Sequence, residues 1–415
     1  MDGLRITEME QLRFQVASDK LQTYTANGFS TKKPSAGKYF SSIWVFPESE
    51  DQLFRWYGTL PRTLVERLVI MYVQSESHIL DPFMGLGTTL DVAARAHVDA
   101  TGIDNNPLAC LATETLLYGI PRLSLNAIAA RIARNLGGLI RDRTMHRSQW
   151  RDIVEEESYS YTRKWFRKDT LDSVLGLLFQ IADVQDIRVQ RLLFLIASQV
   201  AKEVASIDPR CTHHLVTKKK PFIDPISLLR EKMKRGFGAL YDKPPIVSRI
   251  SIRQESVFQS KLEKNSYDFV LAHPPYLGVI HYHLIHRLAT DLLDIVNRVG
   301  SPDSIKHLDF SYEKIKSSDV STDNSERYSS FIKDFAAFMS TVIVPEGRCI
   351  VVIGDQRHRK HLRHPFTEFI QELELNGFML EDIAIWILQN NAGMHVLRRG
   401  NFIDHNYVLV FHNQK

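Results

Sequence analysis

The 415-residue chain has little cysteine and no uninterrupted apolar run long enough to span a bilayer. Its three cysteines, Cys110, Cys211 and Cys349, lack the spacing of metal ligands, which argues against a disulfide framework and against a zinc site. Residues 1–20 are polar and charged, without the apolar stretch of a signal peptide. We therefore expect a cytoplasmic protein with no bound metal and no membrane segment.

The stretch DPFMGLGTT, from Asp81 to Thr89, lacks two features of phosphate-binding loops. It has neither the third glycine of a dinucleotide fingerprint nor the lysine of a triphosphate-binding loop, so NAD and ATP are not favoured. It follows an apolar strand over 78–80 and opens a helix over 88–96, so a ligand can approach its glycines and the free N–H groups of the helix. The next strand ends at Asp104, where doubly wound folds bind ribose hydroxyls. These features favour an adenosine that carries an amino-acid tail.

A second motif ends the apolar strand that begins at Tyr267, and its sequence is His273-Pro274-Pro275-Tyr276. The two prolines stiffen the turn and donate no hydrogen bond, and the carbonyl of Pro274 can accept one. Tyr276 adds an aromatic face directly after the turn. A neutral imidazole at His273 can also accept a hydrogen bond.

The two motifs together resemble the DPFxGxGTT and S/D/N-PPY motifs of S-adenosylmethionine-dependent DNA amino-methyltransferases. In that family the polar residue and the first proline carbonyl accept hydrogen bonds from an exocyclic amino group, and the aromatic ring stacks on a flipped base. His273 stands where cytosine-N4 enzymes usually have Ser and adenine-N6 enzymes usually have Asp or Asn. The continuation from Tyr276 to Tyr282 gives a slight preference for cytosine N4.

The resemblance also implies a set of site residues. The catalytic residues are His273, Pro274, Pro275 and Tyr276. The residues that bind S-adenosyl-L-methionine are Thr59, Leu60, Pro61, Asp81, Pro82, Phe83, Gly85, Gly87, Thr88, Thr89, Asp104, Asn105 and Glu255.

The order of predicted strands and helices indicates an α/β fold. We expect a seven-stranded Rossmann-like class I methyltransferase domain over 38–118 and 246–415, with a mostly parallel sheet and helices on both faces. Its helices include 62–72, which can bury Leu64, Leu68 and Met71. A polar arm over 1–37 precedes it, and a helix-rich insertion over 119–245 interrupts it.

Because the net charge is only +4, local clusters of basic residues say more about a nucleic-acid partner than the total does. The insertion holds several such clusters interleaved with aromatic residues, which suits phosphate contact and base stacking, so we interpret it as a target-recognition region for double-stranded DNA. A further basic loop follows the fifth strand of the predicted sheet, on the edge that carries both motifs. The candidate nucleic-acid-binding residues are Lys164, Arg167, Lys218, Lys219, Lys220, Arg357, Arg359, Lys360, Arg363, Arg398 and Arg399.

Several alternatives stay open at this point. The substrate base can be adenine (N6) instead of cytosine (N4), and an RNA base methyltransferase would need the same two motifs. A protein-glutamine methyltransferase also presents a planar amino group, but it needs no basic insertion. A catalytically silent DNA-binding subunit can retain the fold, and a cognate restriction endonuclease is a further expected partner. Methylation at cytosine carbon 5 is disfavoured, since no cysteine lies near the HPPY motif to act as the nucleophile.

Overall fold

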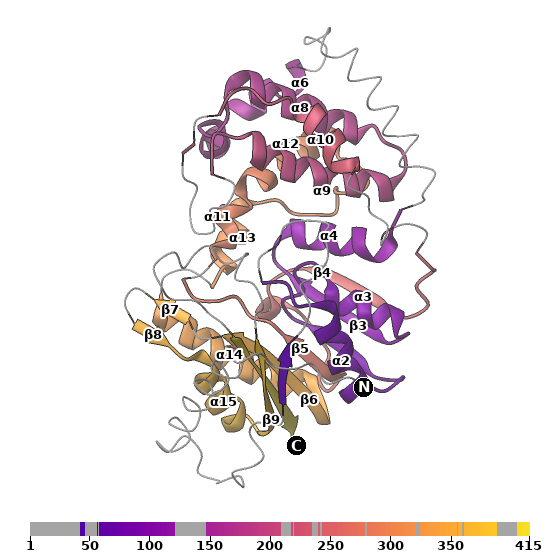
Figure 1. Ribbon diagram of the computed structural model, residues 1–415, viewed down its shortest axis with the longest axis vertical. Helices are drawn as coiled ribbons and strands as arrows, with labels where there is room; N and C mark the ends of the chain where they lie inside the picture. Colours follow the sequence, from indigo (N-terminus) through magenta and orange to yellow (C-terminus); the bar gives the residue numbers. More distant parts are fainter. Residues whose placement is uncertain are drawn as a thin grey trace.

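The computed structural model describes residues 42–45, 56, 58–120, 147–208, 217–218, 220–234, 240, 243–278, 280–320, 324–354, 356–358, 361–387 and 405–415. Figure 1 shows a sheet with helices on both faces and a layer of helices stacked above one part of it. The predicted N-terminal arm, 1–37, and the stretch 121–146 of the insertion lie outside the described residues.

A mixed eight-stranded sheet in the order β1-β9-β10-β6-β5-β2-β3-β4 forms the centre of the described chain. Strand β10 is antiparallel to β6 and β9, and the other neighbouring strands are parallel. Seven of the strands confirm the predicted Rossmann-like methyltransferase arrangement, and β1 adds an edge strand that the prediction lacked. The bounds are β1 Ser42–Val45, β2 His78–Asp81, β3 Asp99–Asp104, β4 Ile250–Gln254, β5 Tyr267–Ala272, β6 Ile343–Gly354, β9 Phe378–Ile387 and β10 His405–Asn413.

Alternate residues of each strand face opposite sides of the sheet and enter two separate apolar clusters. In β5, Phe269 and Leu271 belong to one cluster, whereas Val270 and Ala272 belong to the other. All four side chains are buried, because a parallel strand covered on both faces is apolar along its whole length.

Two groups of helices cover the two faces of the sheet. The first group is α2 (Arg62–Tyr72), α3 (Thr88–Arg95) and α4 (Pro107–Tyr118), and the second is α14 (Ser325–Val342) and α15 (Pro365–Leu375). The start of α4 is fixed locally, because the side chain of Asn106 caps it and Pro107 supplies its first turn. A short hairpin of β7 (Gln356–His358) and β8 (His361–Arg363) follows β6.

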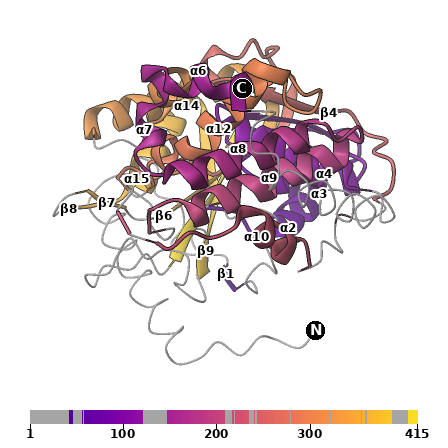
Figure 2. The ribbon, with the colours of Figure 1, turned by 90° about the horizontal axis from the view of Figure 1, so that it is seen from above.

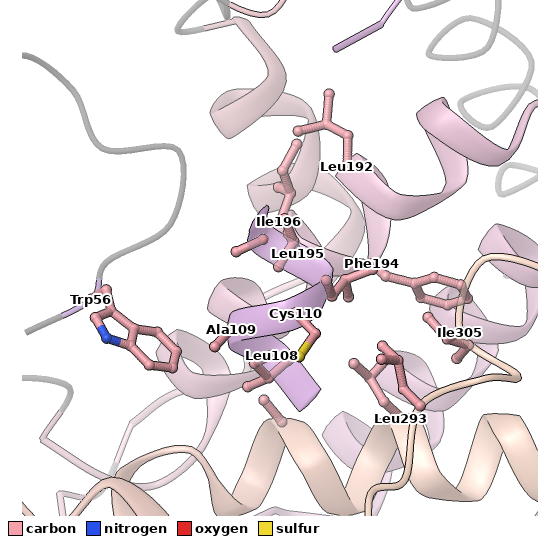
Figure 3. Packing of buried hydrophobic residues seen from close by; sticks show 14 of the residues in the cluster. Trp56, Leu108, Ala109, Cys110, Leu192, Phe194, Leu195, Ile196, Leu293 and Ile305 are labelled. Carbon is pink, nitrogen blue, oxygen red and sulfur yellow. The ribbon is translucent and has the colours of Figure 1, made fainter. Parts of the chain in front are cut away.

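The helical layer packs on α4 (Figures 1 and 2). Figure 3 shows Leu108, Ala109 and Cys110 of α4 beside Leu192, Phe194, Leu195 and Ile196, with Leu293 and Ile305 at the same cluster. One apolar core therefore runs from the sheet face through α4 into the helical layer. The layer consists of α6 (Arg147–Glu155), η1 (Glu157–Tyr159), α7 (Ser160–Arg163), α8 (Lys168–Ala182), α9 (Ile187–Val204), α10 (Pro225–Lys234) and α12 (Arg287–Gly300).

Helix α12 joins this layer although it follows the HPPY motif in the chain. It packs against α6, α8 and α9, and its Arg298 forms an ion pair with Glu156 at 2.8 Å. The predicted insertion, 119–245, thus accounts for α6 to α10 but not for α12. The short helices α11 (Tyr282–Ile285) and α13 (Tyr312–Ser318) connect α12 to the sheet edge that carries the motifs.

Candidate functional site

The DPFMGLGTT stretch forms a tight turn between β2 and α3. Gly85 and Gly87 both have positive φ, at 50° and 74°, which is a conformation that side chains rarely adopt. A Cβ atom at Gly87 would lie 2.4 Å from Thr113 of α4. The Thr113 hydroxyl in turn donates a hydrogen bond to the Gly85 carbonyl at 3.2 Å. The glycines therefore let the turn pack directly on α4 while its backbone faces outward.

Asp104, at the end of β3, connects this turn to the neighbouring strand. Its carboxylate accepts hydrogen bonds from the N–H groups of Gly85 (3.0 Å) and Asn106 (2.9 Å). Burial raises the pKa of Asp104 to about 6 against the effect of these hydrogen bonds, and burial raises the pKa of Asp81 to about 7. Both acids thus titrate close to neutral pH.

The turn opens into a cavity with an empty volume of about 1010 Å³ that also reaches the HPPY motif. Of the residues predicted from the two motifs, the cavity is lined by Thr59, Leu60, Asp81, Pro82, Phe83, Gly85, Thr88, Thr89, Asp104, Asn105, Glu255, His273 and Pro275. The predicted residues Pro61, Gly87, Pro274 and Tyr276 are not among the lining residues of the described chain.

The HPPY motif follows β5, and the hydroxyl of its tyrosine makes polar contacts with two other strands and with His273 of the motif itself. The Tyr276 hydroxyl donates to Asn406 Oδ1 at 2.9 Å and accepts the Gly354 N–H at 3.1 Å. His273 Nε2 lies 3.1 Å from the same hydroxyl. The tyrosine is only 7% exposed, so its ring is packed at the edge of the sheet beside the cavity.

His273 is neutral at pH 7. Burial lowers its pKa to about 4, although a hydrogen bond with the Gly58 backbone acts in the opposite direction. Gly58 has a φ of 78°, and a Cβ there would lie 3.1 Å from the Tyr282 hydroxyl and 3.6 Å from His273. The segment before α2 therefore closes directly over the HPPY motif.

Other lining residues escaped the sequence-based prediction. Trp56, Gly58, Tyr282, His283 and Asp319 all line the cavity. The signal for Tyr282 and His283 was available, since they continue the HPPY motif, and Trp56 lies in the aromatic stretch before α2. Asp319 lies after α13, far from either motif, and only the fold brings it here.

The candidate nucleic-acid-binding residues have different surroundings. The ammonium group of Lys164 lies over the rings of Tyr161 and Trp165, at 4.7 and 4.9 Å from their centroids. Arg167 pairs with Asp169 at 2.9 Å. Lys218 is exposed.

Two of the candidate nucleic-acid-binding residues, Lys220 and Arg363, bind to neighbouring residues of the protein itself. Lys220 donates to the Glu203 carbonyl at 2.7 Å. Arg363, with a side chain 12% exposed, pairs with Glu368 at 2.6 Å. The side chain of Arg357 and all of Lys219, Arg359, Lys360, Arg398 and Arg399 lie outside the described residues.

The described residues hold neither a metal-ligand cluster nor a membrane-spanning helix. No group of three or more His, Cys, Asp or Glu side chains is placed to hold a metal ion there. In the same part of the chain, no helix is long and apolar enough to cross a membrane.

Comparison with known proteins points to one family. Residues 10–114 match the N6/N4 methyltransferase model, which is described as DNA methylase. The chain is 24% identical over 323 residues to the Type II methyltransferase M.MjaII of Methanocaldococcus jannaschii, in a match that spans 56% of this chain and 60% of that protein.

A solved S-adenosylmethionine-dependent methyltransferase from Methanosarcina mazei aligns over 83% of this chain and 96% of its own. Its sequence identity of 11% and TM-score of 0.30 are too low to support an argument. The family match and the curated relative instead carry the comparison. They confirm the resemblance of this chain to the DNA amino-methyltransferases of N4-cytosine and N6-adenine type.

Proposed function

We propose that the protein transfers a methyl group from S-adenosyl-L-methionine to the exocyclic amino group of a flipped base in double-stranded DNA. The observation that carries the proposal is the single cavity that the Gly85 turn and the HPPY motif share. The family match over 10–114 and the similarity to M.MjaII support it further. The chain spans 60% of the length of that relative, so the activity is inferred for this chain and not transferred from it.

The lining residues fit the cofactor. A Cβ at Gly85 would lie 3.1 Å from Trp56 Nε1, so the turn leaves room that any side chain would fill. Asp104 is placed to accept hydrogen bonds from ribose hydroxyls, and Glu255 lies farther along the same wall. The cofactor supplies an electrophilic methyl group on a positively charged sulfur, and the acidic wall formed by Asp81, Asp104, Glu255 and Asp319 complements that charge.

The HPPY motif would orient the amino group of the base. The carbonyl of Pro275 already uses one of its two lone pairs, because it accepts a hydrogen bond from the Tyr328 hydroxyl at 2.9 Å. No hydrogen bond to the Pro274 carbonyl is found among the described residues, so this carbonyl is available as the principal acceptor. Acceptors on the amino hydrogens favour a pyramidal nitrogen whose lone pair is directed at the methyl group.

His273 would be the second acceptor of the amino group. Its Nε2 lies 3.1 Å from the Tyr276 hydroxyl, whose proton goes to Asn406, so Nε2 can accept from the amino group in the tautomer that carries the ring proton on Nδ1. The neutral imidazole at pH 7 is the form that accepts. Tyr276 would then support the base with its ring, after the base has left the helical stack.

Cytosine N4 is our first assignment for the target atom and adenine N6 the second. The preference rests on the sequence that continues from Tyr276 to Tyr282, since His273 matches neither usual residue. Hydrolysis of the methylated DNA and chromatography of its nucleosides against N4-methylcytosine and N6-methyladenine standards decides between them.

The activity is tested with purified protein, tritiated S-adenosylmethionine and mixed-sequence duplex DNA. The proposal predicts labelled DNA, and Pro274→Ala or Tyr276→Ala should remove most of the label while calorimetry still detects cofactor binding. Parallel reactions with transfer RNA, ribosomal RNA and protein test the alternative substrates. Label only in RNA or protein would overturn the DNA assignment, and absence of cofactor binding would indicate a catalytically silent subunit.

The DNA partner would contact the basic residues of the helical layer and of the β7–β8 region. Lys164, beside Tyr161 and Trp165, has the combination of charge and aromatic surface that a nucleic-acid strand needs. We also propose that the protein is located in the cytoplasm. A cognate restriction endonuclease is the expected partner of such an enzyme.

A further inference from the structure

A histidine–aspartate pair lies in the wall of the cavity, outside both motifs. Nδ1 of His283 is 2.6 Å from Oδ2 of Asp319, and the backbone N–H of His283 donates to the same oxygen at 3.1 Å. Both residues line the cavity. Their side chains are 7% and 4% exposed, so the pair is held in a fixed and largely dry position.

The pairing fixes which nitrogen of the ring is available. A carboxylate accepts hydrogen bonds, so Asp319 holds the proton of the neutral imidazole on Nδ1 and leaves a lone pair on Nε2. Nε2 of His283 has no hydrogen-bond partner among the described residues and is not fully buried. Because His283 lines the cavity, we infer that Nε2 faces it.

Aromatic rings flank the histidine of the pair. The ring of Tyr312 in α13 lies 6.1 Å from the ring of His283, and His281 stacks beside it at the same distance. Asp319 also affects two other groups of the cavity wall. Burial is the main cause that raises the pKa of Asp104 and of Tyr282, and the negative charge of Asp319 raises both further. Asp319 therefore acts electrostatically on the cofactor wall as well as on His283.

We propose that His283 is a further catalytic residue, which accepts the proton that the amino group releases on methylation, and that Asp319 positions it. The inference rests on the proposed function. As the N–C bond forms from the nitrogen lone pair, the S–C bond breaks and its electron pair stays on sulfur. The amino nitrogen, now positively charged, gives one proton to Nε2 of His283, and Asp319 stabilises the resulting imidazolium before the proton passes to water.

His283→Asn separates this role from a purely structural one. The Asn amide can still donate a hydrogen bond to Asp319, so it preserves the link between α11 and α13, but it cannot accept a proton. We expect kcat to fall by about 100-fold or more, the lower range for loss of general-base catalysis. The dissociation constant for S-adenosylhomocysteine should stay within twofold of the wild-type value. The residual kcat should rise with pH, because hydroxide then accepts the proton in place of His283.

His307→Asn is the matched control. His307 pairs with Glu114 at 2.8 Å and does not line the cavity among the described residues, so its replacement should leave kcat unchanged. An independent readout needs no turnover: ¹⁵N-labelled histidine spectra of the protein without cofactor should show His283 protonated on Nδ1. Asp319→Asn should shift that tautomer, and His283→Asn identifies the resonance by its loss.

The outcomes separate the two proposals. A wild-type protein that binds cofactor but labels no DNA refutes the proposed function. A wild-type protein that methylates DNA while His283→Asn keeps its kcat refutes the role of His283. Protonation of His283 on Nε2 in the free protein would also refute it, because the nitrogen that faces the cavity would then be a donor.

Discussion

The hydroxyl of Tyr328, in α14, donates a hydrogen bond to the carbonyl oxygen of Pro275 at 2.9 Å. Tyr328 itself is fully buried, with 0% exposure. Helix α14 is remote from the HPPY motif in sequence, yet it supplies a hydrogen bond to one of the two proline carbonyls there. The contact thus couples the position of the motif to the helix packed beneath it.

Tyr328→Phe tests this relationship. The substitution removes one hydrogen bond and no apolar surface, so we expect a stability loss of about 1 kcal/mol, measured by urea unfolding. It also removes the hydrogen bond that holds the Pro275 carbonyl in position, so kcat should fall while the cofactor dissociation constant stays constant. An unchanged kcat would show that the position of Pro275 does not depend on Tyr328.

Gly87→Ala should weaken both folding and cofactor binding. The residue has a φ of 74°, and the added Cβ would lie 2.4 Å from Thr113, so the turn must move away from α4. We expect a loss of about 1–3 kcal/mol in the free energy of unfolding, together with weaker S-adenosylhomocysteine binding by calorimetry.

Gly176→Ala provides the contrast for that experiment. Gly176 lies within α8, and a Cβ there meets nothing within 4 Å. Alanine should stabilise this helix by about 0.5–1 kcal/mol. Equal effects of the two substitutions would contradict the steric explanation.

Much of the central fold is predictable because local signals and burial agree there. Helix α2 was predicted at Arg62–Tyr72, since Pro61 sets its start and apolar residues recur at helical spacing. One detail is wrong: Met71 is 47% exposed, and the helix buries Val65 and Val69 beside Leu64 and Leu68. The spacing of apolar residues thus predicts a buried face of the right width, but one that is rotated about the helix axis by part of a turn.

The parts that escaped prediction depend on contacts between distant segments. Helix α12 carries apolar residues on one face, but nothing in its own sequence says that it packs with helices more than 80 residues earlier. The cavity likewise acquires Asp319 from a loop with no motif, and its hydrogen bond to His283 spans 36 residues. Motifs mark the residues that meet a ligand, whereas the walls around them come from tertiary packing.

Asp91→Ala should strongly destabilise the protein. The buried Asp91 in α3 forms ion pairs with Arg62, with Arg95 at 3.0 Å and with Lys243 at 2.5 Å. Burial acts to raise its pKa, but Lys243 and Arg62 together bring that pKa below its usual value. Removing the carboxylate leaves the buried ammonium group of Lys243 without its partner, which costs about 3–5 kcal/mol for such pairs.

The control for Asp91→Ala is Asp303→Ala, which breaks an exposed pair with Lys306 and should cost less than about 1 kcal/mol. Chemical unfolding of both variants measures the difference. Similar losses at the two sites would contradict a structural role for the charge cluster around Asp91.

Cofactor affinity should decrease as the pH falls through about 6. Burial raises the pKa of Asp104 to about 6, so its carboxylate is charged at pH 8 and becomes neutral as the pH is lowered. A charged carboxylate favours a ligand with a positive sulfur, and protonation removes that attraction, so calorimetry from pH 8 to pH 5.5 should show weaker S-adenosylmethionine binding. S-adenosylhomocysteine, which lacks the sulfonium charge, should show a smaller change. Asp104→Asn should bind S-adenosylmethionine more weakly at pH 8 and lose most of the pH dependence, because its side chain does not titrate; a dependence as steep as that of the wild type would assign the titration to Asp81 instead.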